Sequence, residues 1–514
     1  MNKRIVSGLS ALVLTLAFNT GALANNLKIS DGFVSGVNTV SGTATVQFSV
    51  SWDNSWRDNI NYDAVWLFMK FSVDGGITWR HATLSASGVN PAGFSEGTGM
   101  NMEIFVPLDR KGCFLRRSWI GSGNVITQNV TIAWKYLTDG LSLNEVDNVD
   151  LKIFGIEMVY VPAGSFYAGD YEISNACFSQ GKNIAETDPW YVQSDAAIFV
   201  TNADFNGFYY RSAGNTGESA TGDEFIIPDS FPKGYRAFYL MKYEITEDAW
   251  ADFLNTLTPE QKAQRDITGP DGKNTNAVAD RNTISLAGDK VLTGRPDRAC
   301  GYLSWMDITA YADWSALRPM SELEYEKAAR GKDIPALGGE YAWGTTAITG
   351  ARAISGAEDG AETIATAGAN ANYGNNSLSG GDGGTGPLRA GIFAGSGTTR
   401  SEAGSGYYGA MELSGNLWER VVTVGNVAGR NFQASHGDGI LTSYAGYEGN
   451  ADSSDWPGYV SMRGVSTAEG TGLKGGSYAE TVVTLQAVSD RSKAAQGNAA
   501  RRSDAGGRCV RTAE

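Results

Sequence analysis

Cysteine and histidine are the side chains that most often carry metal or redox chemistry, and this sequence has few of them. Among 514 residues there are 4 cysteines and 2 histidines. The cysteines are Cys113, Cys177, Cys300 and Cys509. No two of them form a CxxC pair, and their even number permits disulfides whose pairing the sequence does not choose. With His81 and His436 alone, a zinc or non-haem iron site built on several histidines is excluded.

Oxygen ligands are more plentiful, in a glycine-rich stretch toward the C-terminus. It contains Asn370, Asn372, Asn375, Asn376 and Asp382, followed by Gly415-Asn416-Leu417-Trp418-Glu419. Amide, carboxylate and loop carbonyl oxygens are the hard ligands that Ca²⁺ takes in proteins. We therefore expect calcium in this stretch; the alternative is that the same side chains only form turns.

Two further groups of residues suggest acid–base chemistry but favour a structural interpretation. Glu322, Glu324 and Glu326 alternate between faces of a short expected helix, which begins at a capping box of Ser321 and Glu324. His436 and Asp438 lie in a glycine-rich loop, where such a pair is more typical of a turn than of a catalytic site. We interpret both groups as scaffold.

The elements that must position these residues fall into two regions. In Val46–Trp52 apolar and polar residues alternate, and similar strands are expected near Val65–Val73 and Val130–Tyr136. The hairpin Asp74–Trp79 resembles an Asp-box, in which the aspartate shapes the turn and the tryptophan packs beneath it. We expect an all-β sandwich domain over 25–148 and a second domain over 149–514.

The N-terminus and the composition indicate an exported protein. Lys3 and Arg4 precede the apolar run Ile5–Phe18 and the small-residue cleavage site Ala22-Leu23-Ala24, so residues 1–24 are expected to be a signal peptide. We therefore expect a periplasmic or extracellular protein without a membrane span. The net charge of −15 argues against a nucleic-acid partner, because phosphate binding needs clusters of Lys and Arg.

Several motifs after Ile156 resemble the formylglycine-generating enzyme (sulfatase-modifying factor) family. They are the strand-to-helix passage Tyr239–Leu254, the helix segment Arg318–Gly331, the turn Tyr341-Ala342-Trp343-Gly344, the segment Gly475-Gly476-Ser477-Tyr478 and the ending Gly506-Gly507-Arg508-Cys509-Val510. The resemblance extends to the C-terminus. It implies an α+β, C-type-lectin-like fold for the second domain, preceded here by the β-sandwich.

The family's enzymes use two cysteines after this Gly-Gly-Ser segment to bind copper and oxidise a substrate cysteine. Counted from Gly475, those positions fall on Leu485 and Asp490, neither of which is a copper thiolate. Cys509 is at the family's non-catalytic terminal position, where burial or a structural bridge, with Cys300 a spatial candidate, is expected. We therefore expect no copper and no formylglycine-generating activity. The family's calcium ligands map onto Asn372, Asp382, Asn416 and Glu419.

The segment Ala479–Asp504 lies where the family's enzymes bind their peptide, and it is rich in polar and small residues. We expect it to be a solvent-accessible surface for a protein or glycan ligand. The expected ligand-binding residues are Trp418, Tyr478, Gln486, Asp490, Arg491 and Arg501. Diversity-generating retroelement variable proteins place their mutable residues in this part of the same fold, so a variable binding protein is one form of this hypothesis.

Three functions therefore compete. The first choice is a secreted, non-catalytic ligand-binding protein, because the family scaffold is kept and its thiols are not. The second is a structural component of a cell-envelope or secretion assembly. The third is an enzyme, for which a formylglycine-generating oxidoreductase is disfavoured by the missing thiols.

Overall fold

A computed structural model describes residues 26–181 and 188–514, and the expected signal peptide lies outside the described residues. The described chain is α+β, as the sequence predicts, and most of its regular elements are strands. The helices are α1 (Leu143–Val146), α2 (Glu247–Leu254), α3 (Pro259–Arg265), α4 (Trp305–Trp314), α5 (Glu322–Arg330), α6 (Val427–Arg430) and the 3-10 helix η1 (Val483–Gln486). No helix among these is long and apolar enough to cross a membrane.

Two sheets contain the N-terminal strands, and the second also includes strands from the later part of the chain. The first contains β1 (Lys28–Ile29), β2 (Phe33–Asn38), β3 (Thr43–Arg57) and β9 (Gly121–Trp134). The second runs in the order β20-β28-β17-β10-β4-β8-β7-β6, with β5 beside β4. Its strands are β4 (Asp63–Ser72), β5 (Arg80–His81), β6 (Gly88–Val89), β7 (Met102–Val106), β8 (Cys113–Arg117), β10 (Asp150–Val161), β17 (Phe238–Met241), β20 (Arg318–Pro319) and β28 (Cys509–Thr512). The strands expected near Val46–Trp52, Val65–Val73 and Val130–Tyr136 are thus confirmed as β3, β4 and β9.

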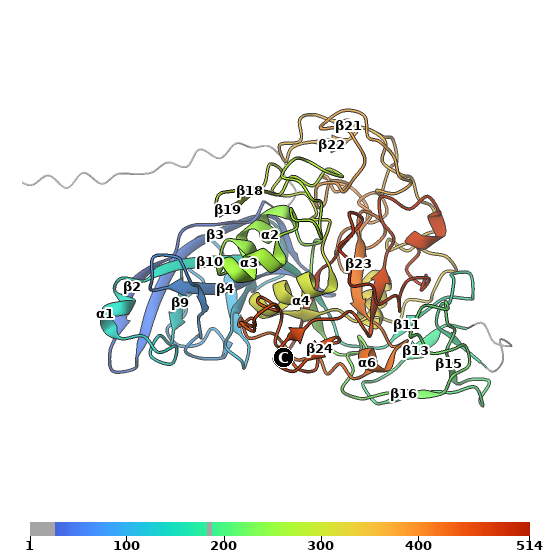
Figure 1. Cartoon of the computed structure of the whole chain (residues 1–514), viewed down its shortest axis with the longest axis horizontal. Helices are drawn as coiled ribbons and strands as arrows, with labels where there is room; N and C mark the ends of the chain where they lie inside the picture. Colours follow the sequence, from blue (N-terminus) through green and yellow to red (C-terminus); the bar gives the residue numbers. More distant parts are fainter. Residues whose placement is uncertain (1–25, 182–187) are drawn as a thin grey trace, which may run out of the picture.

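The second sheet is continuous across the expected boundary at residue 149. Strand β10 pairs antiparallel with β4 from Asp150 opposite Ser72 to Val159 opposite Asp63. The end of β10 also pairs with β17, which belongs to the later part of the chain. The N-terminal strands and the region of the family motifs therefore share one hydrogen-bonded sheet, with the N-terminal strands to one side of helices α2–α4 (Figure 1).

Strand β4 is buried along its whole length because it separates two apolar cores. Val65 and Leu67 face the core that lies between the two sheets. Trp66 and Phe68 face the opposite way, into the core that contains α2 and α4. Successive side chains of a strand point to opposite faces, so one strand can serve both cores. The continuous apolar run of β4 is the sequence signal of this double burial.

Smaller strand groups complete the fold around these cores. They are β11 (Phe166–Ala168) with β13 (Trp190–Val192); β12 (Ser179–Gln180), β14 (Ile198–Val200), β15 (Phe208–Tyr209) and β16 (Phe225–Ile227); β18 (Ser285–Ala287) with β19 (Lys290–Leu292); β21 (Ile354–Ser355) with β22 (Thr363–Ile364); β23 (Trp418–Val422), β26 (Thr471–Lys474) and β27 (Ala505–Gly506); and β24 (Tyr459–Val460) with β25 (Gly464–Val465).

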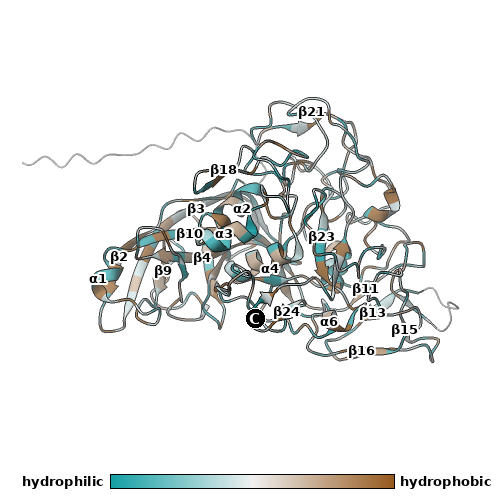
Figure 2. Ribbon diagram, viewed as in Figure 1, coloured by the Kyte–Doolittle hydropathy of each residue, from teal (hydrophilic) through white to brown (hydrophobic). Residues whose placement is uncertain are grey.

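The helix start expected at Ser321 is confirmed, and α2 and α4 begin with similar caps. Thr246 caps α2 by accepting the Ala249 N–H, and Ser304 and Ser321 each form a capping box with the acid three residues later. These caps satisfy backbone N–H groups that have no partner inside the helix. Helix α2 carries both hydrophobic and hydrophilic residues (Figure 2), and its Trp250, Phe253 and Leu254 are buried.

The Asp-box-like hairpin is also formed. Asp74 accepts hydrogen bonds from the backbone N–H groups of Ile77 and Thr78, and these contacts and the Thr78 hydroxyl lower the pKa of Asp74 to about 2. The Trp79 indole N–H donates to the Gly76 carbonyl at 3.0 Å. Asp74 therefore has the structural role that the sequence predicts.

Because β4 serves both cores, we expect the N-terminal strands and the later region to unfold together. Trp66 is fully buried, and its indole N–H donates to the Ser315 carbonyl at 2.8 Å. Trp66→Ala should lower the free energy of unfolding by about 3–5 kcal/mol through loss of packing, measured by chemical denaturation. Trp119→Ala is the matched control, because Trp119 is 73% exposed, and it should change stability by less than about 0.5 kcal/mol. Two separate unfolding transitions in the wild-type protein would contradict the expectation.

Candidate functional site

The four cysteines are all free and buried. Cys300 and Cys509 lie in the same apolar core, yet the structural bridge considered for them is not formed. Burial raises the pKa of Cys113 to about 12, and burial also raises the pKa of the other three thiols. A thiol held in its protonated form is a poor nucleophile and a poor metal ligand.

Leu485 of η1 and Asp490 are the residues at the two positions that the resemblance assigns to the family's active thiols. The cysteine that approaches this region is Cys177, since Arg491 is held by the carbonyls of Asn175 and Ala176. Burial and the nearby charge of Asp170 raise the pKa of Cys177. The residues present do not fit a copper ion bound by two thiolates.

The side chains expected to bind a ligand do not form an accessible surface, and this prediction is wrong for them. The exposed residues of Ala479–Asp504 are others, among them Thr481, Val482 and Thr484. Asp490 is 4% exposed and Arg491 is fully buried. The other expected ligand-binding side chains are also buried: Trp418 (1% exposed), Tyr478 (3%), Gln486 (0%) and the Arg501 side chain (9%). The Gln486 amide has no hydrogen-bond partner among the described residues.

The segment that contains β12 to β16 explains this burial, because it lies over Arg491. The Arg491 guanidinium pairs with Glu322 at 2.8 Å and contacts the rings of Phe178 and Tyr210. It also donates to the Arg211 carbonyl at 3.1 Å. Burial of a guanidinium is tolerated when a carboxylate and carbonyl oxygens accept its donors. Arg491 is therefore a packing residue between two parts of the fold.

Arg501 has a similar role at another place. Its guanidinium forms two hydrogen bonds with the Asp307 carboxylate, at 2.8 and 2.9 Å. Arg265 contacts the same carboxylate at 3.1 Å. Despite burial, these two cations lower the pKa of Asp307 to about 2. Arg501 therefore ties the C-terminal segment to the start of α4.

The three glutamates of α5 are confirmed as scaffold, because each faces a basic side chain. Glu322 pairs with Arg491, Glu324 pairs with Arg318 at 2.6 Å, and Glu326 pairs with Lys474 at 3.2 Å. All three carboxylates are buried. They hold α5 against the segments around it.

The four expected calcium ligands do not form one group of free oxygens. Arg508 holds both oxygens of Glu419, at 2.7 and 2.8 Å. Asp382 pairs instead with Arg295 and Arg298. Each carboxylate therefore already faces an arginine, and the arrangement does not fit a calcium ion, which needs several free oxygen ligands.

The two asparagines of this set belong to a buried hydrogen-bond network. The Asn372 amide donates to Asn416 at 3.1 Å, and Asn416 accepts the Leu388 N–H at 2.8 Å. The Asn416 amide in turn donates to Glu244 at 2.5 Å. Burial and the nearby Glu419 charge raise the pKa of Glu244 well above its usual range. Turn formation and packing account for both amides.

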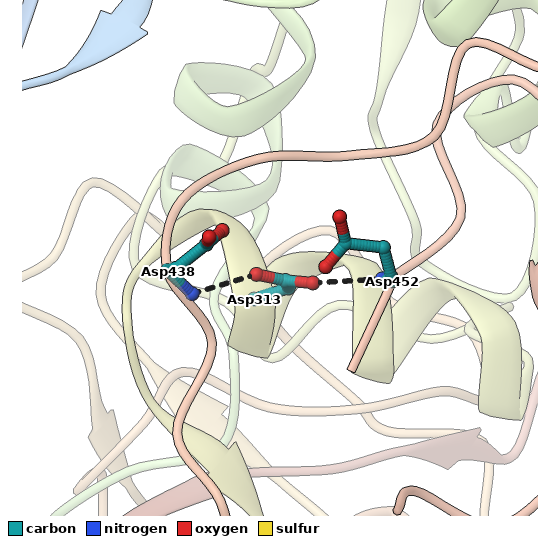
Figure 3. A group of neighbouring side chains, drawn as sticks. All are labelled: Asp313, Asp438 and Asp452. Atoms are coloured by element: carbon teal, nitrogen blue, oxygen red, sulfur yellow. Dashed lines mark hydrogen bonds between the residues drawn. The ribbon is translucent and has the colours of Figure 1, made fainter. Parts of the chain in front are cut away.

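A different group of carboxylates could hold a metal ion such as calcium. Asp313 of α4, Asp438 and Asp452 bring one carboxylate oxygen each within 4.8 Å of the others, the one group of at least three potential ligands from His, Cys, Asp and Glu in the described residues. Figure 3 shows the Asp313 carboxylate between the two loop aspartates. It accepts the backbone N–H groups of Asp438 at 3.0 Å and Asp452 at 2.9 Å.

These hydrogen bonds also give Asp313 a structural role, because they join two loops to α4. Burial and the nearby Asp452 charge raise the pKa of Asp313 to about 8. Lys70 lies beside this group; burial lowers its pKa to about 7 although the charges of Asp313 and Asp438 oppose the change. His436 is not paired with Asp438, since its ring nitrogen accepts the Thr512 N–H at 3.0 Å. A catalytic His–Asp pair is thus absent at this loop.

The residues of this group that sequence reasoning missed are Asp313, Asp452 and Lys70. Asp313 lies inside a helix and Lys70 inside an apolar strand, and in the sequence each looks like a single charge without a partner. A charged residue in a buried segment requires a partner, and that was the available signal. The partners themselves come from distant parts of the chain.

Comparisons with known proteins agree with this architecture. Residues 152–513 match the sulfatase-modifying factor enzyme 1-like domain. A formylglycine-generating enzyme of Streptomyces coelicolor (strain ATCC BAA-471 / A3(2) / M145) is 28% identical over 165 residues. That alignment covers 26% of this chain and 51% of the relative, so the chain spans about half the length of that protein. From β10 to the C-terminal strand, this chain therefore belongs to the sulfatase-modifying factor enzyme 1-like family.

Proposed function

We propose that this chain is an exported, non-catalytic binding protein built on the sulfatase-modifying factor scaffold. The proposal rests on Leu485 and Asp490, which lie at the two positions where the family resemblance implies the reactive thiols. An aliphatic side chain and a carboxylate cannot replace the soft thiolates that hold Cu(I), because they are not suitable ligands for this ion.

The state of the remaining cysteines supports the proposal. Four free thiols are each buried, and burial raises the pKa of every one. The thiolate is the reactive form of cysteine, so none of these side chains is prepared for oxygen-dependent chemistry at neutral pH. A scaffold of this family without its reactive pair keeps its loops and can use them to bind.

The segment that the family resemblance assigns to peptide binding contains buried charges in this chain. Arg491 and Glu322 form a fully buried ion pair there, covered by Phe178 and Tyr210. A ligand could enter only by displacing this pair, which would leave charges without partners. The binding proposal therefore requires a site elsewhere on the molecule.

The first test is copper binding and peptide oxidation. The purified protein, loaded with Cu(I) and given a cysteine-containing peptide and oxygen, should bind substoichiometric copper and form no formylglycine by mass spectrometry. Leu485→Cys/Asp490→Cys is the informative variant, since it restores two thiols at the family positions and should raise Cu(I) binding. Stoichiometric copper and peptide oxidation by the wild-type protein would overturn the proposal.

The second test asks whether the segment around Arg491 is core. Arg491→Met leaves Glu322 buried without its cation and should lower the free energy of unfolding by about 3–5 kcal/mol. Arg236→Met is the matched control, because the Arg236 side chain is 73% exposed in its ion pair with Asp195; its effect should stay within about 1 kcal/mol. Urea denaturation measures both. Equal effects of the two substitutions would show that the buried pair does not hold this region together.

A further inference from the structure

A cleft of about 550 Å³ lies where the N-terminal strands meet the family region. One wall comes from the N-terminal part of the chain and includes Lys70 of β4, Arg80 of β5 and Lys111 of the loop before β8. The opposite wall comes from the segment between α2 and α3, the end of α4 and the loop Asp438–Leu441. This volume lies in the range of small-molecule sites in proteins.

None of the three basic side chains of this cleft forms an ion pair with an acid in the described residues. The Lys70 ammonium donates one hydrogen bond, to the Gly439 carbonyl at 3.2 Å, and Arg80 donates to the Asp139 carbonyl. Elsewhere the buried residues Arg330, Arg491 and Arg508 face carboxylates, whereas the buried residues Lys233, Lys327 and Arg420 donate to backbone carbonyls. The cleft therefore concentrates positive charge in a molecule whose net charge is −15.

Lys70 is held in place within this cleft by the residues around it. Its residue is 1% exposed, and its ammonium lies 5.4 Å from the centre of the Trp314 ring. An ammonium has three N–H donors, so the single hydrogen bond to Gly439 leaves donors unused. The charge of Lys111 also acts on Lys70, and like charges in a buried setting favour a bound anion.

The two acids of the cleft are engaged in other contacts. One Asp139 oxygen accepts the Thr83 N–H at 2.9 Å and the Trp134 indole N–H at 2.7 Å. Asp438 accepts the Ile440 N–H at 2.9 Å, and its carboxylate belongs to the three-aspartate group. The charges of Asp313 and Asp438 act on Lys70, but no acid forms an ion pair with the three cations among the described residues, so they can still take an external anion. Asp438 would repel a doubly charged anion more than a singly charged one.

The remaining lining is mixed: Trp79, Leu257, Trp314, Ile440 and Leu441 are apolar, and the polar side chains are four threonines, His81 and Gln261. Sites with a few convergent polar groups among apolar side chains are typical of small-molecule binding. We propose that this cleft binds a small organic carboxylate, with its anionic group held by Lys70, Arg80 and Lys111 and its hydrocarbon body packed against the apolar lining. The inference deepens the proposed binding function by naming a site and a ligand class.

The test uses calorimetric titration of the full chain with benzoate, with benzamide as its uncharged counterpart and inorganic phosphate as the competing anion, at fixed pH and ionic strength. Benzoate should bind saturably, and benzamide should bind at least about tenfold more weakly because it cannot form charge-assisted hydrogen bonds. Arg80→Gln and Lys111→Gln should each weaken benzoate binding about three- to tenfold. Lys70→Met should weaken it further, with its folding checked by circular dichroism.

Lys290→Gln is the matched control, since Lys290 is an exposed lysine of β19 outside the cleft, and it should leave benzoate binding unchanged. The inference is overturned if benzoate does not saturate, if benzamide binds equally well, if phosphate binds more tightly, or if Lys290→Gln acts like Arg80→Gln. The two proposals fail in different experiments. Copper-dependent peptide oxidation would contradict the proposed function, whereas the benzoate titrations test only this cleft.

Discussion

The pairing of β4 with β10 is the constraint on which the rest of the structure depends. Strand β4 gives one face to the core between the two large sheets and the other to the core of the family region. Its ten residues are all buried, and none can change faces without a shift of the whole register. Because the two regions share this sheet, it fixes α2, α4 and the C-terminal strand β28 in position relative to the N-terminal strands.

Buried ion pairs then complete the family region. Arg491 with Glu322, Arg508 with Glu419 and Arg330 with Glu340 are each inaccessible to solvent or nearly so. Such pairs contribute little net stability relative to apolar packing, but removing one partner is costly. They occupy places where the family resemblance implied a ligand surface and calcium. The same contacts that hold the loops in one arrangement thus leave that region closed.

Function is consequently expected at the junction of the two regions. Joining a β structure to the family scaffold through one sheet creates walls from two parts of the chain, and clefts between such parts are common binding sites. Here the walls bring unpaired cations from the N-terminal strands next to apolar side chains and the three-aspartate group. Neither region alone contains this combination of groups.

The sequence by itself determined the local features and the excluded chemistry. Thr246 and Ser321 as helix caps, the alternating strand β3, and the lack of thiols at Leu485 and Asp490 all follow from residues near one another in the chain. Tertiary structure decided which polar residues are buried, because their partners are distant: Arg508 and Glu419 are 89 positions apart, and Arg491 and Glu322 are 169 apart. From sequence alone, a polar, glycine-rich segment is predicted to be exposed. Burial of a charged side chain is costly unless an oppositely charged partner lies beside it, and here that partner is distant in the chain.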